Sequence, residues 1–210
     1  MPEHPTPPPA LTLPALQAYV REMVRARGFT TELNEIFILL TEEVGELARE
    51  FKHEAFYPER HDAQNLGFEL VDILLYLLDL ANGFGVDLMT LWPRHEQDND
   101  RRFGVAVRDA PAVQPGFTLN ALVAHAEAKR RQRGFADTDE RLLILLMEEL
   151  GEIARELRRH WRGRAAPERM GAEIIDALSY LLRLAHGRGV DLETALRGKE
   201  ARNAQRTWDF

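Results

Sequence analysis

The chain of 210 residues contains an internal duplication, and this feature constrains its fold more than any other. The Arg-Gly-Phe at 27–29 recurs at 133–135, a shift of 106 residues. Beyond a loop that is two residues shorter in the second copy, the Gly-Val-Asp-Leu at 85–88 recurs at 189–192, a shift of 104. Matches in the same order over such a length indicate a structural module that occurs twice.

The duplication divides the chain into four segments. We expect a flexible tail over 1–10, a first module over 11–103, a linker over 104–116 and a second module over 117–210. The tail is rich in proline and lacks the basic start and apolar run of a signal peptide. The linker contains Pro111, Pro115 and Gly116, which break regular structure.

The apolar residues of each module recur at helical spacing. Leu33, Leu40 and Phe51 belong to one apolar stripe of the first module, whereas the segment 66–81 is apolar on nearly every side. A helix of the second kind is expected to be buried on all faces. The sequence therefore predicts an all-α fold with about four helices in each of two tandem modules, which pack together as a pseudo-dimer.

The composition excludes several classes of protein. The chain has no cysteine, so disulfides and thiolate sites are absent, and any metal must be held by oxygen or imidazole. Its net charge of -7 opposes binding to a nucleic acid polymer. No apolar run is long enough to cross a membrane, because Glu69 and Asp72 interrupt the best candidate. We expect a cytoplasmic protein.

Each module carries the same set of acidic residues. The first copy contains Glu42, Glu43, Glu46, Glu69 and Asp72, and the second contains Glu148, Glu149, Glu152, Glu173 and Asp176. Two carboxylates within an apolar helix repel each other unless a cation compensates, and no Arg or Lys lies between Arg60 and Arg94. Ligands that are all carboxylates suit Mg²⁺, with Mn²⁺ as the alternative, and disfavour a di-iron site, which typically has Glu-x-x-His.

Glu-x-x-Glu followed by Glu-x-x-Asp on helices resembles the MazG-like branch of the all-α nucleoside triphosphate pyrophosphohydrolases. The resemblance implies Mg²⁺-dependent conversion of a nucleoside triphosphate to the monophosphate and pyrophosphate, a housecleaning of the nucleotide pool. It implies that the metal ligands are Glu43, Glu46, Glu69 and Asp72 in the first module and Glu149, Glu152, Glu173 and Asp176 in the second. Glu42 and Glu148 would orient or deprotonate the attacking water.

The family often carries a Lys-x-x-x-Asn-x-x-Lys/Arg pattern in its last helix, which contacts the nucleotide. The second module matches it with Lys199, Asn203 and Arg206, whereas the first has His95 before Asn99 and Arg102. The second module also has Arg183 where the first has Asp79, and Arg158 and Arg159 where the first has Lys52 and His53. Because fixed cations stabilise a polyphosphate, we expect the second module to carry most of the turnover.

Two other functions remain open at this point. One is phosphoribosyl-ATP pyrophosphohydrolase, a neighbouring enzyme of the same superfamily, although Leu40-Thr41 lacks the lysine common there. The other is a regulatory protein that binds nucleotide or metal without turnover. The expected partner in either enzyme is a nucleotide substrate, and further association of chains into a homo-oligomer is also open.

Overall fold

The computed structural model describes residues 5–105 and 112–205, and within these ranges it contains eight α-helices and no strand. The predicted all-α fold is confirmed. The helices are α1 (Leu13–Arg27), α2 (Leu33–Phe56), α3 (Ala63–Gly83), α4 (Leu88–Arg102), α5 (Leu119–Gln132), α6 (Asp139–Trp161), α7 (Pro167–Gly187) and α8 (Leu192–Asn203). A short 3₁₀ turn, Pro58–Arg60, lies between α2 and α3.

Local sequence signals explain where the helices begin and end. Asp62 accepts hydrogen bonds from the backbone N–H groups of Gln64 (2.9 Å) and Asn65 (3.3 Å), which satisfies the free donors at the start of α3. Helix α1 ends at Gly28, whose φ of 68° is readily adopted only by glycine. These ends place the acidic stretches of α2 and α3 at the middle of long helices.

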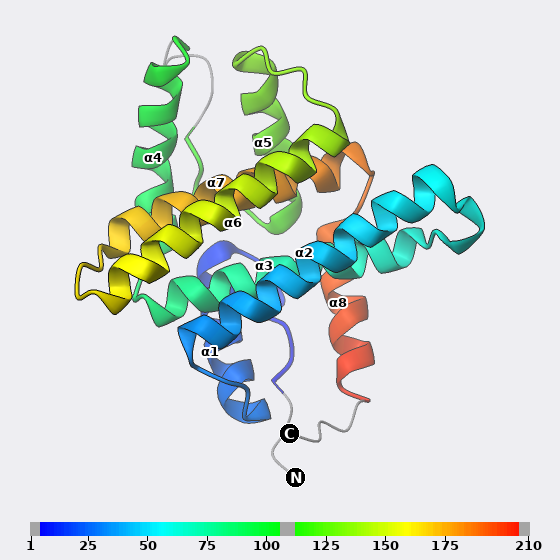
Figure 1. Cartoon of the computed structure of the whole chain (residues 1–210), viewed down its shortest axis with the longest axis horizontal. Helices are drawn as coiled ribbons and strands as arrows, with labels where there is room; N and C mark the ends of the chain where they lie inside the picture. Colours follow the sequence, from blue (N-terminus) through cyan, green and yellow to red (C-terminus); the bar gives the residue numbers. More distant parts are fainter. Residues whose placement is uncertain (1–4, 106–111, 206–210) are drawn as a thin grey trace.

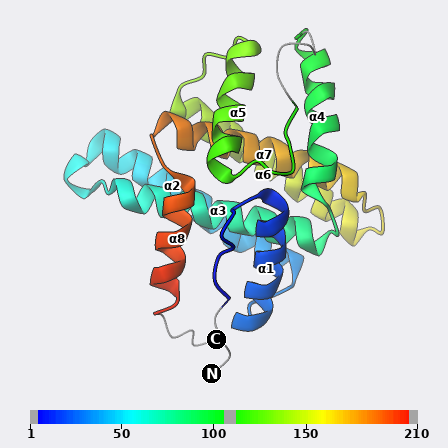
Figure 2. The ribbon, with the colours of Figure 1, turned by 180° about the vertical axis from the view of Figure 1, so that it is seen from behind.

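The helices form three layers around α3 and α7. Figure 1 shows α2 and α6 crossing the front of these two helices, and the view from behind in Figure 2 shows α1, α4, α5 and α8 on the opposite side. Helix α3 therefore has neighbours on all sides. The expectation that segment 66–81 is buried is confirmed, since most of its residues, among them Leu70, Val71 and Leu77, are fully buried.

The last helix of each module packs on the other module. Helix α8 contacts α3, and helix α4 contacts α7. As a result α1, α2, α3 and α8 form the lower half of Figure 1, and α4, α5, α6 and α7 form the upper half. The compact groups of helices thus differ from the modules 11–103 and 117–210 expected from sequence.

Two equivalent glycines lie where the exchanged segments meet α3 and α7. A Cβ atom on Gly171 of α7 would lie 2.5 Å from Leu91 Cδ2 and 2.7 Å from Val86 Cγ1. At the equivalent position in the first module, a Cβ atom on Gly67 of α3 would lie 3.4 Å from Val190. The segment 86–91 therefore approaches the backbone of α7 so closely that only glycine fits at 171, whereas a Cβ atom at 67 would make an ordinary contact.

The starts of the two modules also meet. Thr12 and Thr118, which are equivalent in the repeat, form an isolated antiparallel bridge, and Leu119 N donates to Leu11 O at 3.0 Å. Nearby, Arg197 donates to the carbonyl oxygens of Pro8 (3.1 Å) and Pro9 (2.8 Å). The end of the segment expected to be a free tail is therefore hydrogen-bonded to α8.

Among the described residues, no single helix has the length and apolar character to span a membrane. Only α3 and α4 taken together, which are bent by 102° at their junction, satisfy both criteria.

Candidate functional site

The structure brings acidic side chains of neighbouring helices together in two places. The first cluster consists of Glu43 from α2 with Glu69 and Asp72 from α3, and one carboxylate oxygen of each lies within 4.8 Å of the others. The second cluster, within the same distance, consists of Glu149 from α6 with Glu173 and Asp176 from α7. Each cluster contains three of the four residues that the sequence predicts as metal ligands.

The fourth predicted ligand of each set forms an ion pair along its own helix instead. Glu46 pairs with Arg49, and Glu152 pairs with Arg155, in each case three residues further on. Glu42 and Glu148 are exposed. Arg49 and Arg155, each three residues after the fourth predicted ligand, are the sequence signal that this carboxylate has a partner on its own helix.

Crowding and burial make both clusters hold protons tightly. Burial, together with repulsion from Asp72 and Glu69, raises the pKa of Glu43 to about 8. Burial and the charges of Asp176 and Glu173 likewise raise the pKa of Glu149 to about 8. Such a group of carboxylates is suited to a hard divalent cation, which would relieve the repulsion.

The last helix of each module supplies a polar group to the acids of the other module. Lys199 of α8 forms an ion pair with Asp72 of the first cluster. At the second cluster, Asp176 accepts a hydrogen bond from Asn99 Nδ2 of α4 (3.1 Å) and lies 2.8 Å from His95 Nε2. The expectation that Lys199 serves the acids of its own module is therefore wrong, because the helices are exchanged.

The first cluster is only partly compensated by these contacts. Helix α3 itself carries no cation, as the sequence indicated, but Lys199 reaches Asp72, and Asn65 Nδ2 donates to Glu69 at 2.9 Å. Even with the lysine beside it, Asp72 has a pKa raised to about 6, chiefly by burial. One ammonium group thus faces three carboxylates, which leaves a negative site.

A cavity of about 560 Å³ adjoins the first cluster. Glu43, Asp72 and Lys199 lie on its wall, so the acids and the cation face the same space. The rest of the wall is mainly apolar and comes from α1, α2 and α3 and the α1–α2 loop; it includes Val20, Met23, Val24, Phe29, Ile36, Ile38, Leu39, Leu75 and Tyr76. A cavity of this size and character can enclose a small organic ligand.

A buried polar network forms one side of this cavity. Both terminal nitrogens of Arg27 donate to Glu200, at 3.3 and 2.5 Å, and the Tyr19 hydroxyl donates to the same carboxylate. Asn203 also donates to Glu200 (3.1 Å), but its Oδ1 is buried and has no partner among the described residues. The predicted residue Asn203 is therefore at the first site, together with Lys199.

The cavity beside the second cluster is smaller, at about 160 Å³, and ion pairs fill its surroundings. Lys129 Nζ lies 2.7 Å from Asp100, and Arg133 lies 2.8 Å from the same carboxylate. Arg183 pairs with Asp137 at 2.8 Å, and Arg155 lies 3.4 Å from Glu173 of the cluster. Arg102, which the sequence assigned to substrate binding, is exposed on the wall of this second cavity.

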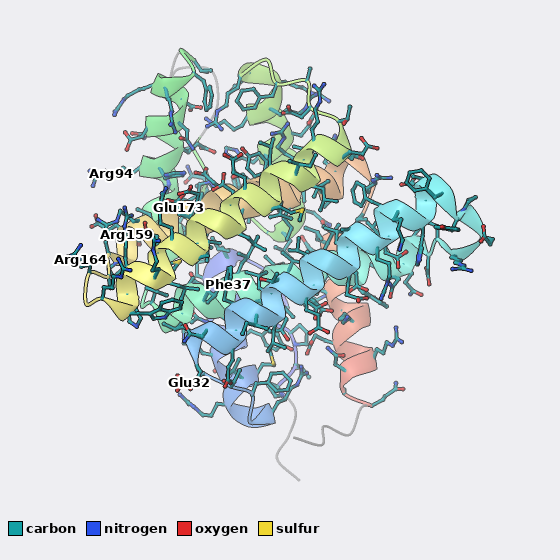
Figure 3. The ribbon with its side chains drawn as sticks, in the orientation of Figure 1. Glu32, Phe37, Arg94, Arg159, Arg164 and Glu173 are labelled. Atoms are coloured by element: carbon teal, nitrogen blue, oxygen red, sulfur yellow. The ribbon has the colours of Figure 1, made fainter. Side chains whose placement is uncertain are left out.

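Further arginines gather beyond the second cluster. Figure 3 shows Arg94, Arg159 and Arg164 along one edge of the molecule, on the side of Glu173. Arg159 pairs with Glu156, which lies outside the cluster. Arg206, the remaining predicted substrate-binding residue, lies outside the described residues.

No family model, curated protein or solved structure matches the chain. The resemblance to MazG-like pyrophosphohydrolases therefore depends on the motifs alone.

Proposed function

We propose that the first site is the active site of a metal-dependent nucleoside triphosphate pyrophosphohydrolase, which converts a nucleoside triphosphate and water to the monophosphate and pyrophosphate. One observation carries the proposal: Glu43 and Asp72 of the carboxylate cluster lie with Lys199 on the wall of a mainly apolar cavity of about 560 Å³. Acids that can hold Mg²⁺ suit a phosphate chain, and an apolar cavity suits a base.

The carboxylates fit the proposed ion. Glu43, Glu69 and Asp72 offer only oxygen ligands, which Mg²⁺ prefers and Mn²⁺ accepts. When bound, the ion supplies neutralisation of phosphate charge and a more acidic water. In its absence the same acids hold protons, as the pKa of about 8 at Glu43 illustrates.

Three side chains have proposed roles in phosphate binding and proton transfer. Lys199 offers an ammonium group to the phosphate chain beside Asp72, and Asn203 offers an amide on the same helix one turn further. Glu42 lies next to Glu43 on α2 and would accept the proton of the attacking water. The water oxygen bonds to phosphorus, the phosphoanhydride P–O bond breaks, and pyrophosphate leaves.

In this proposal the fused modules act as a pseudo-dimer, in which each last helix completes the site of the other module. The pairing of Thr12 with Thr118, and the equivalent contacts at Gly67 and Gly171, support a two-fold relation between the repeats. The second site has the same acids but a cavity of only about 160 Å³. We infer that it contributes little turnover.

Pyrophosphate release from a panel of nucleotides, with Mg²⁺ or Mn²⁺ present, tests the proposal. The substitution Glu69→Gln keeps the acceptor for Asn65 but removes a charge from the cluster, so turnover should fall on the order of a hundredfold or more. Glu59→Gln is the matched control, because Glu59 is exposed beside Arg60 and distant from the cavity wall. A panel without pyrophosphate release would instead favour a regulatory protein that only binds nucleotide.

A further inference from the structure

The far end of the first cavity contains a carboxylate that the proposed chemistry does not use. Asp79 lies on the cavity wall and has no hydrogen bond or ion pair within the described part of the chain. Burial raises its pKa to about 6, so the group is still mainly ionised near neutral pH. Asp79 is only partly exposed, so a ligand that covers its carboxylate has to supply a hydrogen-bond donor in place of water.

The position of Asp79 relative to the carboxylate cluster fits the length of a nucleotide. Asp79 follows Asp72 by seven residues, or nearly two turns, so both side chains lie on the same face of α3 and about 10 Å apart along the helix. A nucleotide whose phosphates lie at the cluster places its base at about this separation. Asp79 is therefore placed to contact the base, because the phosphate end is occupied by Asp72 and Lys199.

A second unpartnered acceptor lies in the same cavity. Asn203 is only 6% exposed, and its Oδ1 has no hydrogen-bond partner among the described residues. Arg27, the buried cation of the wall, pairs with Glu200 through its two terminal nitrogens, while its Nε has no partner among the described residues. Asp79 and the Oδ1 of Asn203 therefore offer hydrogen-bond acceptors on this wall, which N–H or O–H donors of a ligand would satisfy.

We propose that Asp79 is a specificity-determining residue that selects guanine, by accepting hydrogen bonds from the adjacent N1–H and 2-amino groups of that base. This inference rests on the proposed function of the first site. An ionised carboxylate only accepts hydrogen bonds, so it matches two neighbouring donors. Uracil and thymine present one N–H between two carbonyl oxygens, and these oxygens would face the carboxylate unfavourably.

The equivalent residue of the second module shows the opposite chemistry. Arg183 occupies the position of Asp79 in the repeat and is paired with Asp137 at 2.8 Å. An arginine only donates hydrogen bonds, so the donor edge of guanine finds no acceptor there. The proposed selection is therefore a property of the first site alone.

The test compares kcat/KM for GTP, dGTP, inosine triphosphate, ATP and UTP in the full chain with Mg²⁺. We expect GTP and dGTP to exceed ATP and UTP roughly 10- to 100-fold, the discrimination of one good bidentate pair. Inosine triphosphate, which lacks the 2-amino group, should lie between. Asp79→Asn should remove most of the preference for GTP over ATP, because the amide keeps one acceptor oxygen and turns an N–H group toward the donors of guanine.

Asp98→Asn is the matched control, since Asp98 is exposed and pairs with Arg101 away from both cavities; it should leave the order unchanged. The inference is overturned if the wild-type chain uses UTP as well as GTP, if Asp79→Asn leaves the preference for GTP over ATP unchanged, or if its effect requires the 2′-hydroxyl, which would assign Asp79 to the ribose. If no triphosphate is hydrolysed, the proposed function fails separately. In that case the affinities for GMP and AMP are measured by calorimetry. A tenfold preference for GMP that Asp79→Asn removes supports the inference, whereas equal affinities overturn it.

Discussion

The two carboxylate clusters keep the same acids but face different cavities. The first opens on about 560 Å³ of mainly apolar space, whereas the second adjoins about 160 Å³ surrounded by ion pairs. Residues of the first wall that differ at equivalent positions of the second include Met23 against Lys129, Val24 against Arg130, Leu75 against Ser179 and Asp79 against Arg183. Acidic ligands alone therefore do not make two equal sites, because the neighbouring side chains decide what can enter.

The exchange of the last helices changes which of the two sites we expect to be more active. Lys199 was counted with the second module, but it pairs with Asp72 of the first cluster. His95, counted with the first module, lies beside Asp176 of the second. The cation and the larger cavity thus coincide at the first site, and we expect this site to carry most of the turnover.

The largest difference is expected between Glu43→Gln and Glu149→Gln. Each removes the α2 or α6 carboxylate of one cluster. Glu43→Gln should lower kcat for pyrophosphate release on the order of a hundredfold or more, because it removes one carboxylate of the proposed metal site beside the larger cavity. Glu149→Gln should leave most activity. An equal or larger loss from Glu149→Gln would show that the second site dominates.

A smaller difference is expected between Lys199→Met and His95→Leu. Lys199→Met removes the ammonium group beside Asp72, so kcat/KM should fall about 10- to 1000-fold, by analogy with the loss of a transition-state donor. His95→Leu changes only the second cluster and should alter turnover less than threefold. The measurement is steady-state kinetics at saturating Mg²⁺. Comparable losses in the two variants would contradict the assignment of Lys199 to the active site.

The smallest effect is a pH dependence of stability. The pKa of Glu43 is about 8 in the folded chain and near its ordinary value of 4.5 when unfolded, so the folded state binds the proton more tightly between these values. The free energy of unfolding should therefore fall as the pH rises through this window, and Glu149 should add to the fall.

Without divalent cations we expect a melting temperature a few °C lower at about pH 9 than at about pH 6. Saturating Mg²⁺ should raise the melting temperature most at the higher pH, where the carboxylates are free to bind it. Glu43→Gln is the internal comparison, because it removes one titrating group and should flatten the profile. A profile that is flat in the wild-type chain would mean that the clusters do not hold protons as the geometry indicates.

The helices could be predicted from sequence because their signals are local. The apolar stripe of α2 and the all-round apolar character of α3 predict which faces of these helices are buried, and Gly28 predicts the end of α1. The meeting of Glu43 with Glu69 and Asp72 also followed from helical spacing in adjacent helices. Such features depend on residues close together in the chain.

The partner of each last helix could not be predicted in the same way. Because the modules are repeats, α3 and α7 offer similar surfaces, and the sequence does not say which of them α8 contacts. The choice depends on the packing of the whole chain, including the close approach of α4 to Gly171. The position of Lys199, and the cavity that Asp79 and Asn203 share, follow from that choice and were therefore missed.

The presence of both modules in one chain allows the residues of the two sites to change independently. In a homodimer of single modules, one mutation in the gene would enter both sites at once, and a change harmful to either would be removed. In the fused chain a mutation at Met23 or Asp79 alters one site, while Lys129 or Arg183 changes independently. Because the two modules are fused, the residues of one cavity can be selected for ligand binding while those of the other form ion pairs that stabilise the fold.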